Sequence, residues 1–291
     1  MYCNFETMPS IYWTEAEEKG TIEKCVYDTE DALKIGRMIQ KYAYVYLPFG
    51  YQRGKDYKVA YFMHGAGTDI SEFLNHGEEC SPMKNVLDHM IQYKDVEQMI
   101  VVFPTYYQGD YNPSNCTMEK DVFLGKYFPQ ELVSSLMPAV ESRYCTATGR
   151  ETAHRSRRGF GGFSFGGAIT WEVFSQCLEQ FSFFFPASGY FLDKIAERSV
   201  DLGKRVSQLA GHVENSYKEA KEFYIYAVTG EKDIAYTPMK EQIQLMKKVP
   251  EIFNEENMTF AVCENGLHNY EYAGMYLYNA LRAFDWYTGG A

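Results

Sequence analysis

Hydrophobic positions along the 291-residue chain follow two patterns that alternate from one end to the other. Short, nearly continuous apolar runs are typical of parallel strands that are buried on both faces, and apolar residues at helical spacing are typical of amphipathic helices. The runs predict strands at 23–27, 41–47, 58–63, 98–103, 157–161, 181–185, 223–228 and 258–262. The helical spacing predicts helices at 81–93, 127–142, 168–178, 237–248 and 270–287.

This alternation predicts a single α/β domain over residues 1–291, with a mainly parallel central sheet and helices on both faces. Residues 1–22 are polar with scattered aromatics and are expected to form a lead-in segment. Residues 190–221 carry many charges and show weak periodicity, which indicates an insertion over the sheet edge, close to the functional site.

The composition allows a sizeable core and argues against two classes of partner. Hydrophobic residues make up 46% of the chain, and the net charge is −11. Because nucleic-acid binding needs a basic face, and an anionic membrane surface attracts basic patches, neither partner is expected. No apolar run is long enough to span a bilayer.

Seven scattered cysteines form no C-x-x-C pair, which indicates reduced, mostly buried thiols and not a disulfide framework. His76, Glu78, Glu79 and Cys80 match no closed zinc pattern, so neither a metal nor another cofactor is expected. The first residues lack the basic start and apolar core of a signal peptide, which favours a cytoplasmic chain or a module cut from a longer secreted protein. The cysteines are Cys3, Cys25, Cys80, Cys116, Cys145, Cys177 and Cys263.

The stretch Gly162-Phe163-Ser164-Phe165-Gly166 has the form G-x-S-x-G, the nucleophile elbow of serine hydrolases on an α/β sheet. In such an elbow the serine lies on a strained turn between a strand and a helix, and a side chain two residues before or after it would collide with these elements. A predicted strand precedes the motif and a predicted helix follows it. A plain glycine turn is the alternative, because the motif also occurs by chance.

A serine hydroxyl needs a base within hydrogen-bond reach, and the base needs a carboxylate that fixes its tautomer. In α/β-hydrolases these residues follow in the order nucleophile, acid, histidine. His268 is the predicted base for Ser164, because it follows a strand through a glycine loop, whereas His154 precedes the elbow strand and His212 lies in the charged segment.

Asp233 is the predicted acid, because it follows the preceding strand with a glycine turn in front of it. Glu231 in the same loop and Asp193 remain its rivals. Ser164, Asp233 and His268 each come shortly after a strand, and parallel sheets place their working loops at the carboxyl ends of strands.

The oxyanion of an acyl-transfer reaction needs two backbone donors. One is expected from the N–H of Phe165, directly after the nucleophile, and the other from the N–H of Ala66 in His64-Gly65-Ala66-Gly67. The ring of His64 itself is expected to brace this loop by hydrogen bonds, not to take part in catalysis.

Tyrosines after two of the strands are candidates for contact with the substrate. Tyr106, Tyr107 and Tyr111 follow the strand at 98–103, and Tyr190 follows the strand at 181–185. Their rings offer a face for a phenolic or sugar ring, so they are predicted to line the substrate site. The alternative is that the tyrosines at 106–111 merely pack their own loop.

Four blocks in order resemble carbohydrate esterase family one, the feruloyl and acetyl xylan esterases of the α/β-hydrolase superfamily. The resemblance implies an α/β-hydrolase fold and hydrolysis of esters on plant cell-wall polysaccharides, usually by a module of a secreted multidomain enzyme. Phe165 stands where the family often has methionine, and residues 190–221 match no family motif. The blocks are Val59-Ala60-Tyr61-Phe62-Met63-His64-Gly65-Ala66-Gly67, Gly162-Phe163-Ser164-Phe165-Gly166-Gly167, Thr229-Gly230-Glu231-Lys232-Asp233 and Gly266-Leu267-His268-Asn269-Tyr270, with Tyr46-Leu47-Pro48 before them.

Three functions fit this sequence. The first is a serine carboxylesterase that acts on feruloyl or acetyl esters of xylan through Ser164, His268, Asp233 and an acyl-enzyme. The second is an acyltransferase that uses the same residues and an acceptor other than water. The third is a carbohydrate-binding module with a relic elbow, against which the ordered triad counts.

Overall fold

The computed structural model describes residues 5–34, 36–74, 81–144, 155–197, 199–216 and 221–289 of the chain. Its strands form one eight-stranded sheet in the order β1-β2-β4-β3-β5-β6-β7-β8. β2 runs antiparallel to both β1 and β4, and the other neighbours are parallel. The strands are β1 (Thr21–Glu30), β2 (Met38–Leu47), β3 (Lys58–Met63), β4 (Met99–Phe103), β5 (Arg158–Phe163), β6 (Phe183–Ala187), β7 (Tyr224–Gly230) and β8 (Met258–Cys263).

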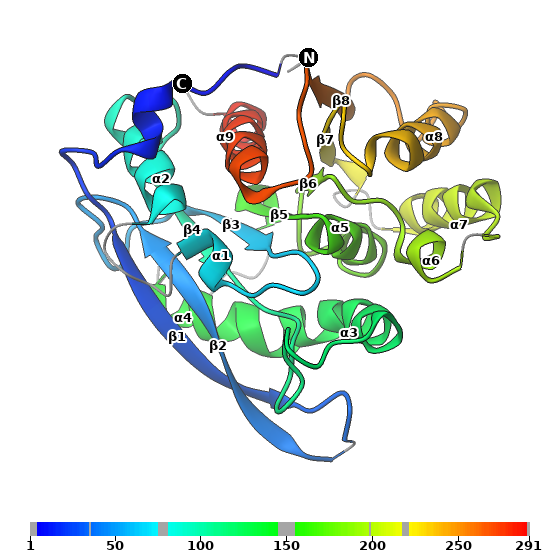
Figure 1. Cartoon of the computed structure of the whole chain (residues 1–291), viewed down its shortest axis with the longest axis horizontal. Coiled ribbons are helices and arrows are strands. Elements are labelled where there is room, and N and C mark those ends of the chain that lie inside the picture. Colours follow the sequence, from blue (N-terminus) through cyan, green and yellow to red (C-terminus); the bar gives the residue numbers. More distant parts are fainter. Residues whose placement is uncertain are drawn as a thin grey trace.

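Helices cover both faces of this sheet (Figure 1). One hydrophobic cluster joins α3, α4, α5, α7 and α8 to one face, and a second cluster joins η1, α2 and α9 to the other. Tyr61 of β3 belongs to the first cluster and Phe62 to the second, as the two-residue repeat of a strand requires. The helices are η1 (Ser10–Trp13), α1 (Ser71–Leu74), α2 (Pro82–Gln92), α3 (Met118–Glu131), a π-helix (Leu132–Leu136), α4 (Met137–Tyr144), η4 (Arg155–Arg157), α5 (Phe165–Gln176), α6 (Leu192–Ala196), α7 (Leu202–Asn215), α8 (Tyr236–Met246) and α9 (Tyr270–Tyr287). The predicted α/β architecture, a mainly parallel sheet with helices on both faces, is confirmed.

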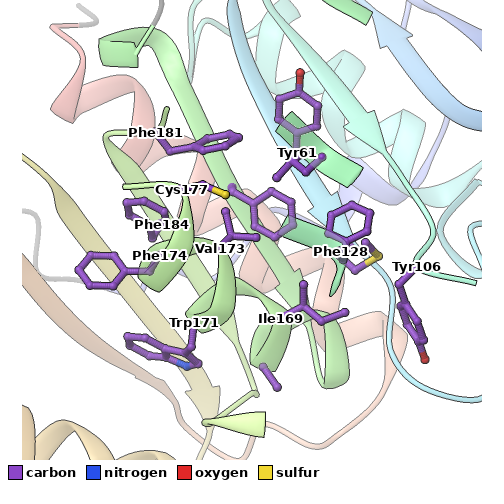
Figure 2. Packing of buried hydrophobic residues seen from close by; sticks show 14 of the residues in the cluster. Tyr61, Tyr106, Phe128, Ile169, Trp171, Val173, Phe174, Cys177, Phe181 and Phe184 are labelled. Carbon is purple, nitrogen blue, oxygen red and sulfur yellow. The ribbon is translucent and has the colours of Figure 1, made fainter. Parts of the chain in front are cut away.

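The helix that follows the elbow is fixed against the sheet by large side chains. Figure 2 shows Ile169, Trp171 and Phe174 of α5 in a cluster that also contains Tyr61 of β3 and Phe128 of α3. These five side chains are buried. The indole nitrogen of Trp171 donates a hydrogen bond of 3.0 Å to the carbonyl oxygen of Gly189. The N-terminus of α5 is therefore held in a defined place beneath the site.

The prediction of an insertion over the sheet edge at residues 190–221 is wrong. The described part of this segment forms α6 and α7 and connects β6 to β7, which are neighbours inside the sheet. Helix α7 buries one apolar stripe, so it is an ordinary crossover helix that covers a sheet face. Charged residues between the stripe positions hid the helical spacing from the sequence analysis. The buried residues of α7 are Leu202, Val206, Leu209, Ala210 and Val213.

Two element boundaries also differ from the predictions. The described part of the lead-in segment contains η1, whose Tyr12 is buried and stacks on His89 of α2, and β1 already begins at Thr21. The helix predicted at 127–142 begins earlier, because Thr117 caps α3, and it runs through the π-helix into α4.

Candidate active site

Ser164 lies on a strained turn between β5 and α5, with φ 58° and ψ −116°. A Cβ atom on Gly162 would lie 2.5 Å from the carbonyl carbon of Gly166, and one on Gly166 would lie 2.3 Å from the carbonyl oxygen of Met63. Both distances are too short for any side chain. The two glycines therefore allow β5, the start of α5 and the end of β3 to lie in close contact. The Ser164 N–H donates to the carbonyl oxygen of Ala187 at 2.8 Å, which ties the turn to β6.

Ser164, His268 and Asp233 form a continuous chain of hydrogen bonds. The Nε2 atom of His268 lies 2.8 Å from Ser164 Oγ, and its Nδ1 atom lies 2.7 Å from Asp233 Oδ1. The Asp233 side chain is fully buried, and 23% of the His268 side chain is exposed. Because a carboxylate only accepts, Nδ1–H donates to Asp233 and leaves Nε2 free to accept the serine proton. The structure thus brings together three predicted residues from three different loops.

The rival acids and bases lie elsewhere. Asp193 forms ion pairs with a lysine of α3 and an arginine of α7. Glu231 accepts a hydrogen bond of 3.2 Å from a backbone N–H of the loop before His268, and no contact with the imidazole itself is found among the described residues. His212 bonds to a serine at the end of α5, and His154 lies outside the described residues. Asp233 is the carboxylate that the structure places on His268.

The two expected oxyanion donors border the nucleophile. Phe165 is the first residue of α5, and a Cβ atom on Gly65 would lie 3.3 Å from the Cβ atom of Ser164, which places the Ala66 loop against the elbow. Among the residues that the structure describes, neither the Phe165 N–H nor the Ala66 N–H has a hydrogen-bond partner. Both donors are therefore free to meet a developing oxyanion.

His64 is buried at the start of this loop and braces it. Its Nδ1 atom lies 2.7 Å from the Gly65 carbonyl oxygen, and its Nε2 atom lies 2.8 Å from the Thr105 hydroxyl. Burial lowers the pKa of His64 to about 4, so the ring is neutral near pH 7, donates from Nδ1 and accepts at Nε2. These contacts match the bracing role that the sequence analysis expected.

The tyrosines of the β4–α3 loop do not form an open platform, which corrects that prediction. Exposed fractions are 1% for Tyr106, 5% for Tyr107 and 6% for Tyr111. Tyr106 packs against the Phe165 ring, with centroids 5.2 Å apart, and the Tyr111 hydroxyl donates to a buried carboxylate of α3 at 2.7 Å. The loop folds back on α3 and α5 because its hydroxyls find partners inside the protein. Tyr190 is half-buried against the same cluster, so a role in substrate contact stays a prediction for it.

Ser188 is a site residue that the sequence analysis missed. It follows β6 with φ 48°, and its hydroxyl donates to Asp233 Oδ2 at 2.7 Å, while the Ala235 N–H donates to Oδ1 at 2.7 Å. Both oxygens of the carboxylate are thus held by protein donors in addition to His268. The position of Ser188 directly after a strand, at the edge where the working loops lie, was the signal that the sequence contained.

The described residues contain no cluster of side chains that could bind a metal ion. Within the described ranges no group of three or more His, Cys, Asp or Glu side chains could hold a metal. Residues 76–80, where no metal site was expected, lie outside these ranges. Four cysteines are free thiols, and Cys3, Cys80 and Cys145 lie outside the described residues. None of the described helices has the length and apolar character needed to cross a membrane.

No protein-family model matches the chain. The chain is 32% identical over 290 residues to endo-1,4-beta-xylanase Y of Acetivibrio thermocellus, with 96% of this chain and 24% of the xylanase covered. It therefore spans about a quarter of that relative. A serine-to-alanine mutant of the feruloyl esterase module from Clostridium thermocellum, solved with sinapinate, is 29% identical with a TM-score of 0.80, covering 99% of this chain and 95% of the module. A structure described as FAE is 30% identical with a TM-score of 0.78, covering 96% and 93%.

Proposed function

Because the chain belongs to carbohydrate esterase family one, the feruloyl and acetyl xylan esterase-like family of the α/β-hydrolases, we propose that it hydrolyses feruloyl esters on plant cell-wall xylan. The chain is a serine carboxylic ester hydrolase. The observation that carries the proposal is the hydrogen-bond chain from Ser164 through His268 to Asp233 at the strained elbow. The similarity to a feruloyl esterase module and to a xylanase supports feruloyl esters of xylan as the substrate class.

In the proposed reaction Ser164 Oγ attacks the ester carbonyl while His268 Nε2 takes its proton. Asp233 stabilises the imidazolium, and the N–H groups of Phe165 and Ala66 bind the oxyanion of the tetrahedral intermediate. The imidazolium then gives its proton to the leaving alcohol, which departs and leaves an acyl-enzyme. A water molecule, activated by the same imidazole, releases the acid and restores the serine.

A substrate panel tests this function. We expect the chain to turn over methyl ferulate and feruloyl-arabinose esters of xylo-oligosaccharides faster than acetyl or butyryl esters of the same alcohols, as measured by kcat/KM. A fluorophosphonate should label Ser164. A labelled serine with turnover on acetyl xylan alone would assign an acetyl esterase, and transfer to an added alcohol in preference to water would assign an acyltransferase. An unlabelled, folded protein would point to a non-catalytic module.

We further propose that two exposed apolar residues meet the alcohol side of the substrate. His268 must reach the leaving oxygen, so the sugar leaves past the residues that border the histidine. Leu267, directly before it, is 45% exposed, and Ile234, directly after Asp233, is 80% exposed. The two loops are connected by a hydrogen bond of 3.0 Å from the Lys232 N–H to the carbonyl oxygen of Gly266. Aliphatic side chains at this rim can pack on the apolar face of a pentose.

Replacement of this rim by polar residues tests the idea. We expect Ile234→Ser and Leu267→Ser each to lower kcat/KM on a feruloyl-arabinose ester about fivefold, since burial of a small apolar area contributes about 1 kcal/mol. Turnover of methyl ferulate should not change. Ile11→Ser is the control, because Ile11 is also aliphatic and is 51% exposed, but lies on η1 and not on the loops that carry Asp233 and His268. Equal losses on both esters would mean that the rim supports His268 and not the sugar.

A further inference from the structure

The loop that carries Ala66 is held on both sides by tyrosine hydroxyls. The Gly65 N–H donates to Tyr270 Oη at 3.3 Å, and the Gly67 N–H donates to Tyr107 Oη at 2.9 Å. The Ala66 N–H between them is left without a partner among the described residues. We propose that Tyr107 and Tyr270 are positioning residues, which aim the Ala66 N–H at the oxyanion by binding the N–H groups on either side of it. This inference rests on the proposed function.

Packing alone does not fix this loop. Gly67 is exposed with φ 71°, and a Cβ atom added to it would meet nothing within 4 Å. A glycine in such a position can rotate its peptide groups at little cost. The bond from its N–H to Tyr107 therefore sets the orientation of the peptide that follows Ala66. On the other side, Gly65 lies against Ser164, so the loop is fixed at one end by contact and at the other by a hydrogen bond.

Tyr107 is itself held rigidly. Its ring stacks on His64, with centroids 5.4 Å apart and planes at 19°, and its hydroxyl also bonds to that of Tyr106 at 3.1 Å. Burial raises its pKa above the usual value, so the hydroxyl stays neutral and accepts from Gly67. The loop beneath it is anchored by Lys41, whose Nζ donates to the carbonyl oxygen of Thr105 at 2.9 Å.

Tyr270 holds the other side from the start of α9. Its ring packs against Phe73 and Phe163, with centroids 5.1 and 5.4 Å away. Its hydroxyl also bonds to the hydroxyl of Thr68, in the same loop as Gly65. Two residues that are far apart in the sequence thus approach the oxyanion loop from opposite ends. A donor held in place before the reaction needs no reorganisation when the charge develops, which is the origin of its effect on rate.

The experiment removes each hydroxyl and keeps each ring. We expect Tyr107→Phe and Tyr270→Phe to lower kcat on methyl ferulate about 10- to 100-fold with KM unchanged, since complete removal of one oxyanion donor costs about 100- to 1,000-fold. Inhibition by phenylboronic acid, which forms a tetrahedral adduct with Ser164, should weaken by a similar factor. Binding of ferulate, which makes no such adduct, should not weaken.

Tyr111→Phe is the matched control. It removes a buried hydroxyl from the same tyrosine cluster, but that hydroxyl donates to Asp121 and accepts from the Thr117 N–H, and does not contact the oxyanion loop. We expect a lower melting temperature at most, with kcat and boronate inhibition as in the wild type.

The outcomes separate this inference from the proposed function. If the wild type hydrolyses acetyl or butyryl esters better than feruloyl esters of the same alcohols, the proposed function is wrong and the same comparison of variants is made on the preferred ester. If both variants fold and keep the wild-type kcat, or lose activity through KM with boronate inhibition unchanged, the positioning role is overturned. Should one variant fail to fold, the other decides, because each tyrosine holds a different N–H.

Discussion

Ser164→Ala is expected to lower kcat/KM on feruloyl esters by at least about three orders of magnitude, and to leave the fold intact. The oxygen that is lost is the atom that His268 contacts at 2.8 Å, and without it the imidazole and Asp233 have no nucleophile to activate. The fold should tolerate the change because Ala keeps the Cβ atom that the strained turn already accommodates, and Ser164 is only half-buried. Steady-state kinetics and thermal unfolding of the same preparations measure both effects.

Ser188→Ala is the matched control for this prediction. Ser188 also has a positive φ and also lies at the end of a strand, but its hydroxyl donates to Asp233 instead of to the imidazole. Its loss should cost about 10-fold, the order of one hydrogen bond to a charged group. Turnover by folded Ser164→Ala at more than a few per cent of the wild type would remove the serine from the nucleophile role.

The elbow was predictable from the sequence because its constraints are local. The two glycines around Ser164 are required by contacts within the strand–turn–helix unit and with the adjacent strand. The buried strands were predictable for a similar reason, since β3, β4 and β6 are buried at every position and consist almost entirely of apolar residues. A residue type that is required by contacts with its near neighbours can therefore be interpreted from the sequence alone.

The tyrosines show where such reasoning fails. Tyr106, Tyr107 and Tyr111 carry hydroxyls, which suggested contact with water or substrate, but all three are buried. Their partners come from other parts of the chain, such as Asp121 for Tyr111 and the Gly67 N–H for Tyr107. A hydroxyl that is paired inside the protein no longer favours exposure. Such pairing depends on tertiary contacts, so the burial of these hydroxyls cannot be predicted from the local sequence pattern.

Helix α7 was hidden for the same physical reason. Its charged side chains look like those of a solvated loop, but Arg205 is mostly buried, and it bonds to Glu172 of α5 and Asp193 of α6. A charge that finds partners on neighbouring helices can lie beside an apolar stripe. The sequence contains both the stripe and the charges, and only the packed structure shows which of them decides the fold of this segment.

The second large effect is expected for the acid and the base. His268→Ala should lower kcat by about six orders of magnitude, and Asp233→Asn by about four, because the carboxylate orients and stabilises the imidazole but does not itself transfer the proton. An Asn amide that faces Nδ1 would favour the tautomer with its proton on Nε2, which cannot accept from Ser164. The measurement is kcat on methyl ferulate for each folded variant.

Asp193→Asn is the control for the acid, because the ion pairs of Asp193 are formed with Lys126 and Arg205 and do not involve the imidazole. We expect its kcat to equal that of the wild type, with at most a small change in stability. The Asp233 side chain, by contrast, is fully buried and accepts from His268, Ser188 and the Ala235 N–H, so no solvent-exposed carboxylate can take its place without movement of the β7–α8 loop. Full activity of Asp233→Asn together with a loss in Asp193→Asn or Glu231→Gln would transfer the acid role to that residue.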